Sequence, residues 1–284
     1  MADCMKKQKV GTFDLVSLDD GGFRLDGGAM HGVVPRILWS RENPPDELNR
    51  ISMRARPLLV RGPFGNLLIE AGLGDVGDDV FHERYAVEQP RGLIHGLSQA
   101  GISPEEIDFV ALTHLHWDHA GGLVHTGPEG GVRLTFPGAV HFIQERAWQD
   151  AFRPGPRAGS FHPDRLEPLE GNARLELVTG DAEILPGVRL VPAGGHGDGH
   201  AVVLMSSGGK TAVFLADLVP ISSQFKTNWI MAFDLQPART AEDKQALLTR
   251  AHEENWLQVL YHDDEIAFGT LSRDEGGRFV LDPC

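Results

Sequence analysis

A dense run of titratable residues directly after an apolar segment constrains the fold of this chain most. Residues 107–112 are short and apolar, which predicts a buried strand. His114, His116, Asp118 and His119 follow this segment at once. In open α/β sheets, functional sites gather outside the carboxyl ends of strands. The run therefore predicts an α/β architecture with a functional site at the end of this strand.

The residue types in this run are those of a metal site. Neutral imidazoles and carboxylates are good ligands for zinc and similar ions. His114 and His116 would point the same way on a strand, because side chains alternate with a period of two. Asp118 and His119 lie just beyond, and the glycines of residues 120–122 are expected to let the backbone approach the ions. We expect this segment to supply ligands to two adjacent sites.

Three more candidate ligands, His196, Asp217 and His262, each stand at the end of a predicted strand. The strands concerned are 188–192, 211–216 and 257–261. A histidine or an aspartate at a strand end is often only a cap or turn residue. Here the two oxygens of Asp217 can bridge two cations about 3.5–4 Å apart, as paired-metal hydrolases require. Together with the first run, these residues predict a two-ion site.

The order His-x-His-x-Asp-His, then His, Asp and His, resembles the metallo-β-lactamase superfamily, from about residue 59 to about residue 266. The resemblance implies a four-layer αβ/βα sandwich with the site at one edge. No linker divides the chain, so we expect one domain over residues 1–284. The resemblance implies three ligands for a first ion, three for a second, and one bridging carboxylate. These are His114, His116 and His196, then Asp118, His119 and His262, then Asp217.

Two further residues near these motifs are expected to support the ligands. Glu70, in Glu70-Ala71-Gly72, stands where many relatives have Asp-x-Gly. We expect its carboxylate to contact a ligand and not an ion. His200 follows the Gly-rich turn around His196, and we expect it to form a local hydrogen bond.

The two ions imply hydrolysis by a metal-bridging hydroxide. Paired cations lower the pKa of a shared water and polarise an ester, lactone, thioester or phosphoester. Asp118 would orient the hydroxide and is the predicted catalytic residue. Zinc is the favoured ion, and manganese, iron or cobalt also suit these ligands. No serine, cysteine or histidine nucleophile with its own base and orienting group is apparent.

Several classes of function are disfavoured. A net charge of −14 argues against nucleic-acid and membrane partners. Asp217 argues against a β-lactamase, and His116, where redox relatives carry Glu, argues against a diiron oxidoreductase. The N-terminus lacks the apolar core of a secretory signal, and Cys4 and Cys284 do not indicate a disulfide framework. We therefore predict a cytoplasmic protein with a small-molecule substrate.

Residues 26–56 read as a long irregular loop with apolar side chains, which predicts a lid or an interface. Residues 26–44 resemble a branch that contains quorum-quenching N-acyl-homoserine lactonases, and this is the favoured function. Apolar side chains would then cover an acyl chain, or else pack a core edge or a homodimer interface. The candidates are Met30, Trp39, Phe225, Trp229 and Ile230.

One departure keeps other functions open. Lactonases of this superfamily place a Tyr shortly after the bridging Asp, whereas residues 218–220 are Leu-Val-Pro, and Tyr85 and Tyr261 are the only tyrosines. Strand alternation predicts that Tyr261 points away from the ions. A methyl-parathion-hydrolase-like phosphotriesterase is the main alternative. A glyoxalase-II-like thioesterase is disfavoured because no basic C-terminal segment is seen, and a non-catalytic binding protein because all seven ligands are present.

Overall fold

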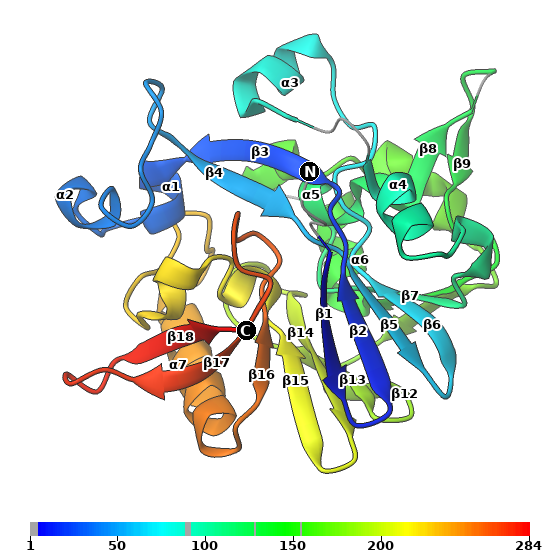
Figure 1. Cartoon of the computed structure of the whole chain (residues 1–284). Coiled ribbons are helices and arrows are strands. Elements are labelled where there is room, and N and C mark those ends of the chain that lie inside the picture. Colours follow the sequence, from blue (N-terminus) through cyan, green and yellow to red (C-terminus); the bar gives the residue numbers. More distant parts are fainter. Residues whose placement is uncertain (1–4, 89–91, 128, 154) are drawn as a thin grey trace.

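The computed structural model describes residues 5–88, 92–127, 129–153 and 155–284. Two seven-stranded sheets lie face to face, with helices on their outer sides (Figure 1). The first sheet has the order β1-β2-β5-β6-β7-β10-β11, and the second runs from β12 to β18 in chain order. The first sheet is parallel from β6 to β11, and the second is antiparallel except between β15 and β16. The sheets are therefore mixed, as an α/β sandwich requires.

The strands of the first sheet are β1 (Lys6–Val10), β2 (Phe13–Ser17), β5 (Leu58–Gly62), β6 (Gly65–Ile69), β7 (Phe109–Leu112), β10 (Val140–Gln144) and β11 (Leu175–Val178). Those of the second are β12 (Ala182–Leu185), β13 (Val188–Pro192), β14 (Ala201–Ser207), β15 (Lys210–Phe214), β16 (Leu257–Val259), β17 (Phe268–Arg273) and β18 (Phe279–Pro283). Two hairpins stand apart, β3 (Gly21–Asp26) with β4 (Arg50–Ala55), and β8 (Val124–Thr126) with β9 (Val132–Leu134).

The α-helices are α1 (Gly27–His31), α2 (Arg36–Trp39), α3 (Asp79–Tyr85), α4 (Gly92–Gln99), α5 (Trp117–Ala120), α6 (Glu145–Phe152) and α7 (Pro237–Glu253). Short 3₁₀ turns are η1 (Pro104–Glu106), η2 (Gly121–Leu123), η3 (Gly155–Ser160), η4 (Pro163–Arg165), η5 (Glu167–Leu169), η6 (Ala216–Leu218) and η7 (Ser222–Phe225).

Both faces of the central strands are buried, which explains their continuous apolar runs. In β5, Leu58 and Val60 belong to the core between the sheets, whereas Leu59 packs on the outer side. In β15, Phe214 faces the other sheet and Val213 faces outward. The strand period of two thus divides each run between two cores.

Helices cover the outer side of each sheet. Leu97 of α4 and Ala147 of α6 pack with the outward residues of the first sheet. Leu248 of α7 packs with the outward residues of the second sheet. The layers are therefore helix, sheet, sheet and helix, and the four-layer sandwich predicted from the sequence is confirmed (Figure 1).

Two segments differ from their expected character. Residues 26–56 are not irregular throughout, because they contain α1, α2 and strand β4, which pairs with β3 along its whole length. The sequence of residues 153–172 carries Pro, Gly, Arg and His without a period, which is typical of a surface insertion, but Leu166 and Leu169 are buried in the outer core of the first sheet. Both segments are therefore packed parts of the fold, and both border the functional site.

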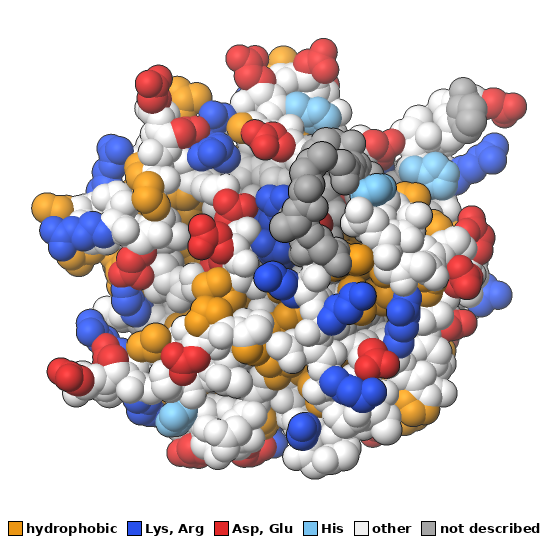
Figure 2. Space-filling view, in the orientation of Figure 1, with side chains coloured by type: hydrophobic (Ala, Val, Ile, Leu, Met, Phe, Trp, Pro, Cys, Tyr) orange, Lys and Arg blue, Asp and Glu red, His pale blue; other side chains and the backbone are white. Residues whose placement is uncertain are grey.

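The exterior carries mixed charge. On the face in Figure 2, Lys and Arg side chains lie interspersed with Asp and Glu. Apolar side chains protrude around α2, where Ile37 is 68% exposed and Leu38 is 46% exposed. Within the described residues, no helix combines the length and apolar character that crossing a bilayer requires.

Candidate metal centre

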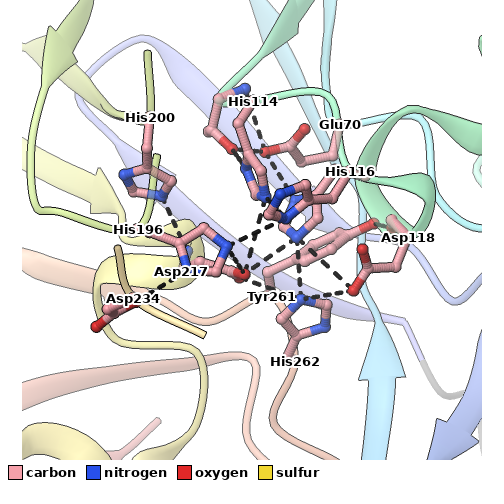
Figure 3. Close-up of polar contacts among 12 residues, drawn as sticks. Glu70, His114, His116, Asp118, His196, His200, Asp217, Asp234, Tyr261 and His262 are labelled. Carbon is pink, nitrogen blue, oxygen red and sulfur yellow. Dashed lines mark hydrogen bonds and ion pairs between the residues drawn. The ribbon is translucent and has the colours of Figure 1, made fainter. Parts of the chain in front are cut away.

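The seven predicted ligands meet in one buried cluster (Figure 3). They come from the loop and helix α5 that follow β7, from the loops that follow β13 and β16, and from η6 after β15. None of the seven is more than 7% exposed. Ligands up to 148 positions apart in the chain are thus brought together, because the strands before them end at one edge of the sandwich.

Four of the seven residues form a first donor set. His116 Nδ1 lies 2.9 Å from His114 Nε2 and 3.1 Å from His196 Nε2. Oδ2 of Asp217 lies 3.0 Å from His196 Nε2 and 3.8 Å from His114 Nε2. Three imidazole nitrogens and one carboxylate oxygen therefore point at a common centre, which is a suitable donor set for zinc.

The other three ligands form a second donor set beside the first. His262 Nε2 lies 3.0 Å from His119 Nε2 and 3.5 Å from Oδ2 of Asp118. Oδ1 of Asp217 lies 3.3 Å from His119 Nε2 and 3.2 Å from His262 Nε2. The two oxygens of Asp217 thus face different sets, which is the position that a bridging carboxylate occupies.

The outward nitrogens of the histidines show that the cluster suits a cation. His262 Nδ1 donates to the carbonyl of Arg54 at 2.9 Å, and His196 Nδ1 donates to Asp234 at 2.9 Å. A proton on Nδ1 leaves the lone pair of Nε2 pointing inward. Oδ1 of Asp217 is buried without a hydrogen-bond donor among the described residues. Lone pairs facing lone pairs are satisfied by a cation, so the residues present fit the metal pair.

Glu70 and His200 support the ligands as expected. The carboxylate of Glu70 is fully buried and lies 3.3 Å from His119 Nδ1, on the side of the ring away from the cluster. It also accepts hydrogen bonds from the backbone and the hydroxyl of Thr113. His200 donates from Nδ1 to the carbonyl of Ala193 at 2.6 Å, and its Nε2 accepts from the backbone N–H of Asp217 at 3.2 Å. Both residues therefore orient ligands.

Burial and the neighbouring charged groups shift the pKa values of several ligands. Burial and neighbouring imidazoles hold the pKa of His114 well below its usual value. Burial would raise the pKa of Asp217, but the imidazoles of His119, His196 and His262 hold that pKa well below its usual value. Burial would lower the pKa of His119, but the carboxylates of Asp217, Asp118 and Glu70 raise it well above its usual value. Asp217 is therefore ionised at neutral pH, as a metal ligand must be.

A pocket opens over the cluster, and its wall is largely apolar. It is lined by five of the ligands together with Leu25, Met30, Met53, Tyr85, Trp117, Arg157, Ser160, Met231 and Phe233. Of the five predicted substrate-binding residues, Met30 lies in this wall. Trp39 is instead stacked on His31 at 5.0 Å between ring centroids, and Trp229 makes an edge-to-face contact with the same His31 ring.

The remaining two candidates also lie outside this wall. Phe225 is 1% exposed and belongs to the core beneath α7. Ile230 is half-buried, and its carbonyl lies against Gly32. Apolar character alone does not separate a pocket wall from a core, which is why these residues were grouped with Met30.

The glycines after the first run have a different role from the one expected. A Cβ on Gly122 would collide with the carbonyl of Ala71, and one on Gly121 with the carbonyl of Leu73. The two glycines therefore allow the backbone of η2 to approach residues 71–74, and not the ions. This packing seats the histidine run against the end of β6.

Several residues of the site were not predicted, and three of them carry polar or charged groups that bear on its chemistry. Asp234 holds His196, and Tyr85 and Arg157 line the pocket. Tyr85 lies on α3, where its ring packs against Trp117 at 5.2 Å between centroids. None of the three residues directly follows a strand, so their positions in the sequence did not indicate a role in the site.

Residues 57–262 match the sequence profile of the Metallo-beta-lactamase superfamily, and the chain belongs to this family. A probable metallo-hydrolase of Mycobacterium tuberculosis is 26% identical over 282 residues, which cover 87% of each chain. The solved structure of a probable metal-dependent hydrolase from Staphylococcus aureus superposes with a TM-score of 0.89 at 28% identity and covers 98% of this chain and 99% of that chain.

A lactonase structure shares the same fold. AidC, described as a dizinc quorum-quenching lactonase in complex with a product, superposes with a TM-score of 0.79 at 21% identity and covers 99% of this chain and 97% of that chain. Family and site together define a metallo-hydrolase of the metallo-β-lactamase superfamily.

Proposed function

We propose that this metallo-hydrolase is a dinuclear lactonase that opens N-acyl-homoserine lactones. One observation carries the proposal: Asp217 presents its two oxygens to two separate donor sets at the floor of an apolar pocket. The likeness of residues 26–44 to the quorum-quenching branch and the shared fold with a lactonase add support.

Each ligand has a defined task in this proposal. His114, His116 and His196 would hold one ion, and Asp118, His119 and His262 the other, with Asp217 between them. When bound, two divalent cations supply Lewis acidity that polarises a carbonyl and lowers the pKa of water. Asp118 lines the pocket, so its carboxylate can accept a hydrogen bond from the attacking water and orient it.

The apolar wall would hold the acyl chain. Met30 of α1, Met53 of β4, Met231 and Phe233 all line the pocket. Methionine fills irregular gaps and adapts to ligands of different shape. Because α1 contributes Met30, we assign residues 26–56 the role of a lid. Trp39, Phe225, Trp229 and Ile230 would support this wall from behind.

A substrate panel at matched metal content tests the proposal. We expect the protein loaded with zinc to release acid from N-acyl-homoserine lactones, with rates that depend on chain length. Aryl phosphotriesters and thioesters of similar size form the comparison arms. Turnover of phosphotriesters without turnover of any lactone would refute the proposal and favour the phosphotriesterase alternative.

Metal analysis tests the two-ion part separately. We expect two equivalents of metal per chain, and fewer after Asp217→Ala, because one carboxylate serves both donor sets. His116→Ala should remove the first ion preferentially. Retention of two ions by both variants would contradict the assigned sets. Three further properties remain predictions: zinc as the native ion, a cytoplasmic location and a homodimer. In a homodimer, the exposed side chains of Ile37 and Leu38 of α2 would form the apolar contact.

A further inference from the structure

Arg157 brings a positive charge into the wall of the apolar pocket. It lies on η3, and it lines the pocket together with Ser160 and the ligands His116, His196 and Asp217. The rest of the wall is mainly methionine, leucine and aromatic side chains. A guanidinium in such surroundings is the strongest hydrogen-bond donor available to a ligand beside the metal centre.

The guanidinium of Arg157 has an unused donor. Its Nη2 is shielded from solvent and has no hydrogen-bond partner among the described residues. Arg165, in the same segment, differs in that its Nη2 donates to Asp75 and to the carbonyl of Val124, although its Nε also has no partner among the described residues. A buried donor without an acceptor costs free energy, and an acceptor on a bound ligand would offset that cost.

Carboxylates near Arg157 compensate its charge, but none of the described residues accepts a hydrogen bond from its Nη2. Burial lowers its pKa, but the carboxylates of Asp234 and Asp217 act in the opposite direction. Its charge is therefore already compensated at a distance, although no carboxylate of the described residues forms an ion pair with it. A neutral carbonyl oxygen can satisfy such a donor without adding another negative charge beside Asp217.

We propose that Arg157 donates a hydrogen bond to the acyl-amide carbonyl of the substrate and thereby selects lactones that carry an acylamino group. The proposal deepens the lactonase assignment and rests on it. An N-acyl-homoserine lactone has two carbonyls. The ring carbonyl must reach the ligand cluster for cleavage, which leaves the amide carbonyl for a donor in the pocket wall.

Two lactones that differ in the amide test this role. We compare N-hexanoyl-homoserine lactone with γ-decalactone, which has an alkyl chain and no amide. For Arg157→Gln we expect kcat/KM to fall about tenfold or more with the first lactone and less than about twofold with the second. Arg157→Lys, which keeps the charge but not the planar fork, should give an intermediate loss. Arg153→Gln is the matched control, because Arg153 directly follows α6 in the same region and is exposed.

An equilibrium measurement separates binding from turnover. N-cyclopentylhexanamide keeps the amide but has no lactone to cleave. We expect it to inhibit the wild-type protein competitively, and its inhibition constant should rise about tenfold in Arg157→Gln and stay unchanged in Arg153→Gln.

Three results would overturn this assignment. If kcat/KM falls equally for both lactones and the melting temperature is lower, Arg157 has a structural role. If the Gln variant does not fold, Arg157→Lys provides the same comparison. A larger effect of Arg157→Gln on a lactone bearing a carboxylate than on the amide would show an anion site. Absence of any lactone turnover by the wild-type protein would refute the lactonase function and this inference together, whereas turnover with an unchanged ratio would refute the inference alone.

Discussion

The hydroxyl of Tyr261 donates a hydrogen bond to the backbone carbonyl of Asp118, with 2.5 Å between the two oxygens. Tyr261 is fully buried, and burial raises its pKa well above the usual value, so the hydroxyl keeps its proton. The bond joins the segment after β16 to the histidine run after β7. Tyr261 does not line the pocket, and its hydroxyl is engaged with the backbone.

Replacing Tyr261 by Phe should lower stability. The change leaves the buried carbonyl of Asp118 without this donor, which costs about 1–3 kcal/mol of unfolding free energy. Urea denaturation at fixed metal content measures the effect. An unchanged midpoint with an unchanged slope would show that the hydrogen bond contributes nothing.

Tyr85→Phe should lower activity and leave stability nearly unchanged, in contrast to Tyr261→Phe. Tyr85 lines the pocket from α3 and is half-buried, so its hydroxyl can contact a bound substrate. We expect kcat/KM for the lactone to fall about tenfold, the equivalent of one hydrogen bond of about 1.4 kcal/mol, with little change in the melting temperature. Full activity in Tyr85→Phe would show that carbonyl polarisation does not involve this phenol.

Asp234→Asn should weaken metal binding. Asp234 accepts the Nδ1 proton of His196 and so keeps Nε2 free for an ion. Loss of such a partner typically costs 10–100-fold in metal affinity, and we expect about tenfold here. Competition with a chromogenic chelator measures the affinity. Asp198→Asn is the control, because Asp198 is exposed two residues from His196; equal weakening in both variants would contradict the assigned role.

Lys244 should make stability depend on pH at the alkaline end. Its buried ammonium donates to the carbonyls of Gln224 and Trp229 at 3.2 and 2.8 Å. Burial lowers its pKa to about 8 from the usual 10.5. Between these two pKa values the unfolded chain binds more protons than the folded chain. The contribution of Lys244 to the free energy of unfolding therefore rises with pH in this range and is constant below about pH 8.

The comparison with Lys244→Met isolates this effect. From about pH 7 to about pH 10, the wild-type protein should gain about 2–3 kcal/mol of unfolding free energy relative to the variant. Denaturant unfolding at several pH values measures the difference. A difference that stays constant with pH would show that Lys244 titrates normally in the fold.

The ligands were predictable because their signal is local. Each of His114, His196, Asp217 and His262 lies close behind a short apolar run, and strand ends collect at one edge of a sheet. Ligand chemistry then groups residues that are far apart in the chain. The prediction needed neither the exact strand boundaries nor the packing of the helices.

The parts that were missed depend on packing between distant segments. Asp234 lies 38 residues after His196 and follows no strand. Arg157 lies in a segment rich in Gly and Pro, where no periodicity indicates which side chains turn inward. Strand β4 did carry a signal, since Ile51, Met53 and Ala55 alternate with polar residues, but the glycines and prolines before it obscured this pattern.

The two donor sets draw on both halves of the sandwich. The histidine run follows a strand of the first sheet, whereas His196, Asp217 and His262 follow strands of the second. Ions held between them would act as a non-covalent cross-link between the two sheets. Chelation should therefore reduce the cooperativity of unfolding as well as remove activity, because the halves would then keep only their apolar contacts and hydrogen bonds such as that of Tyr261 with Asp118.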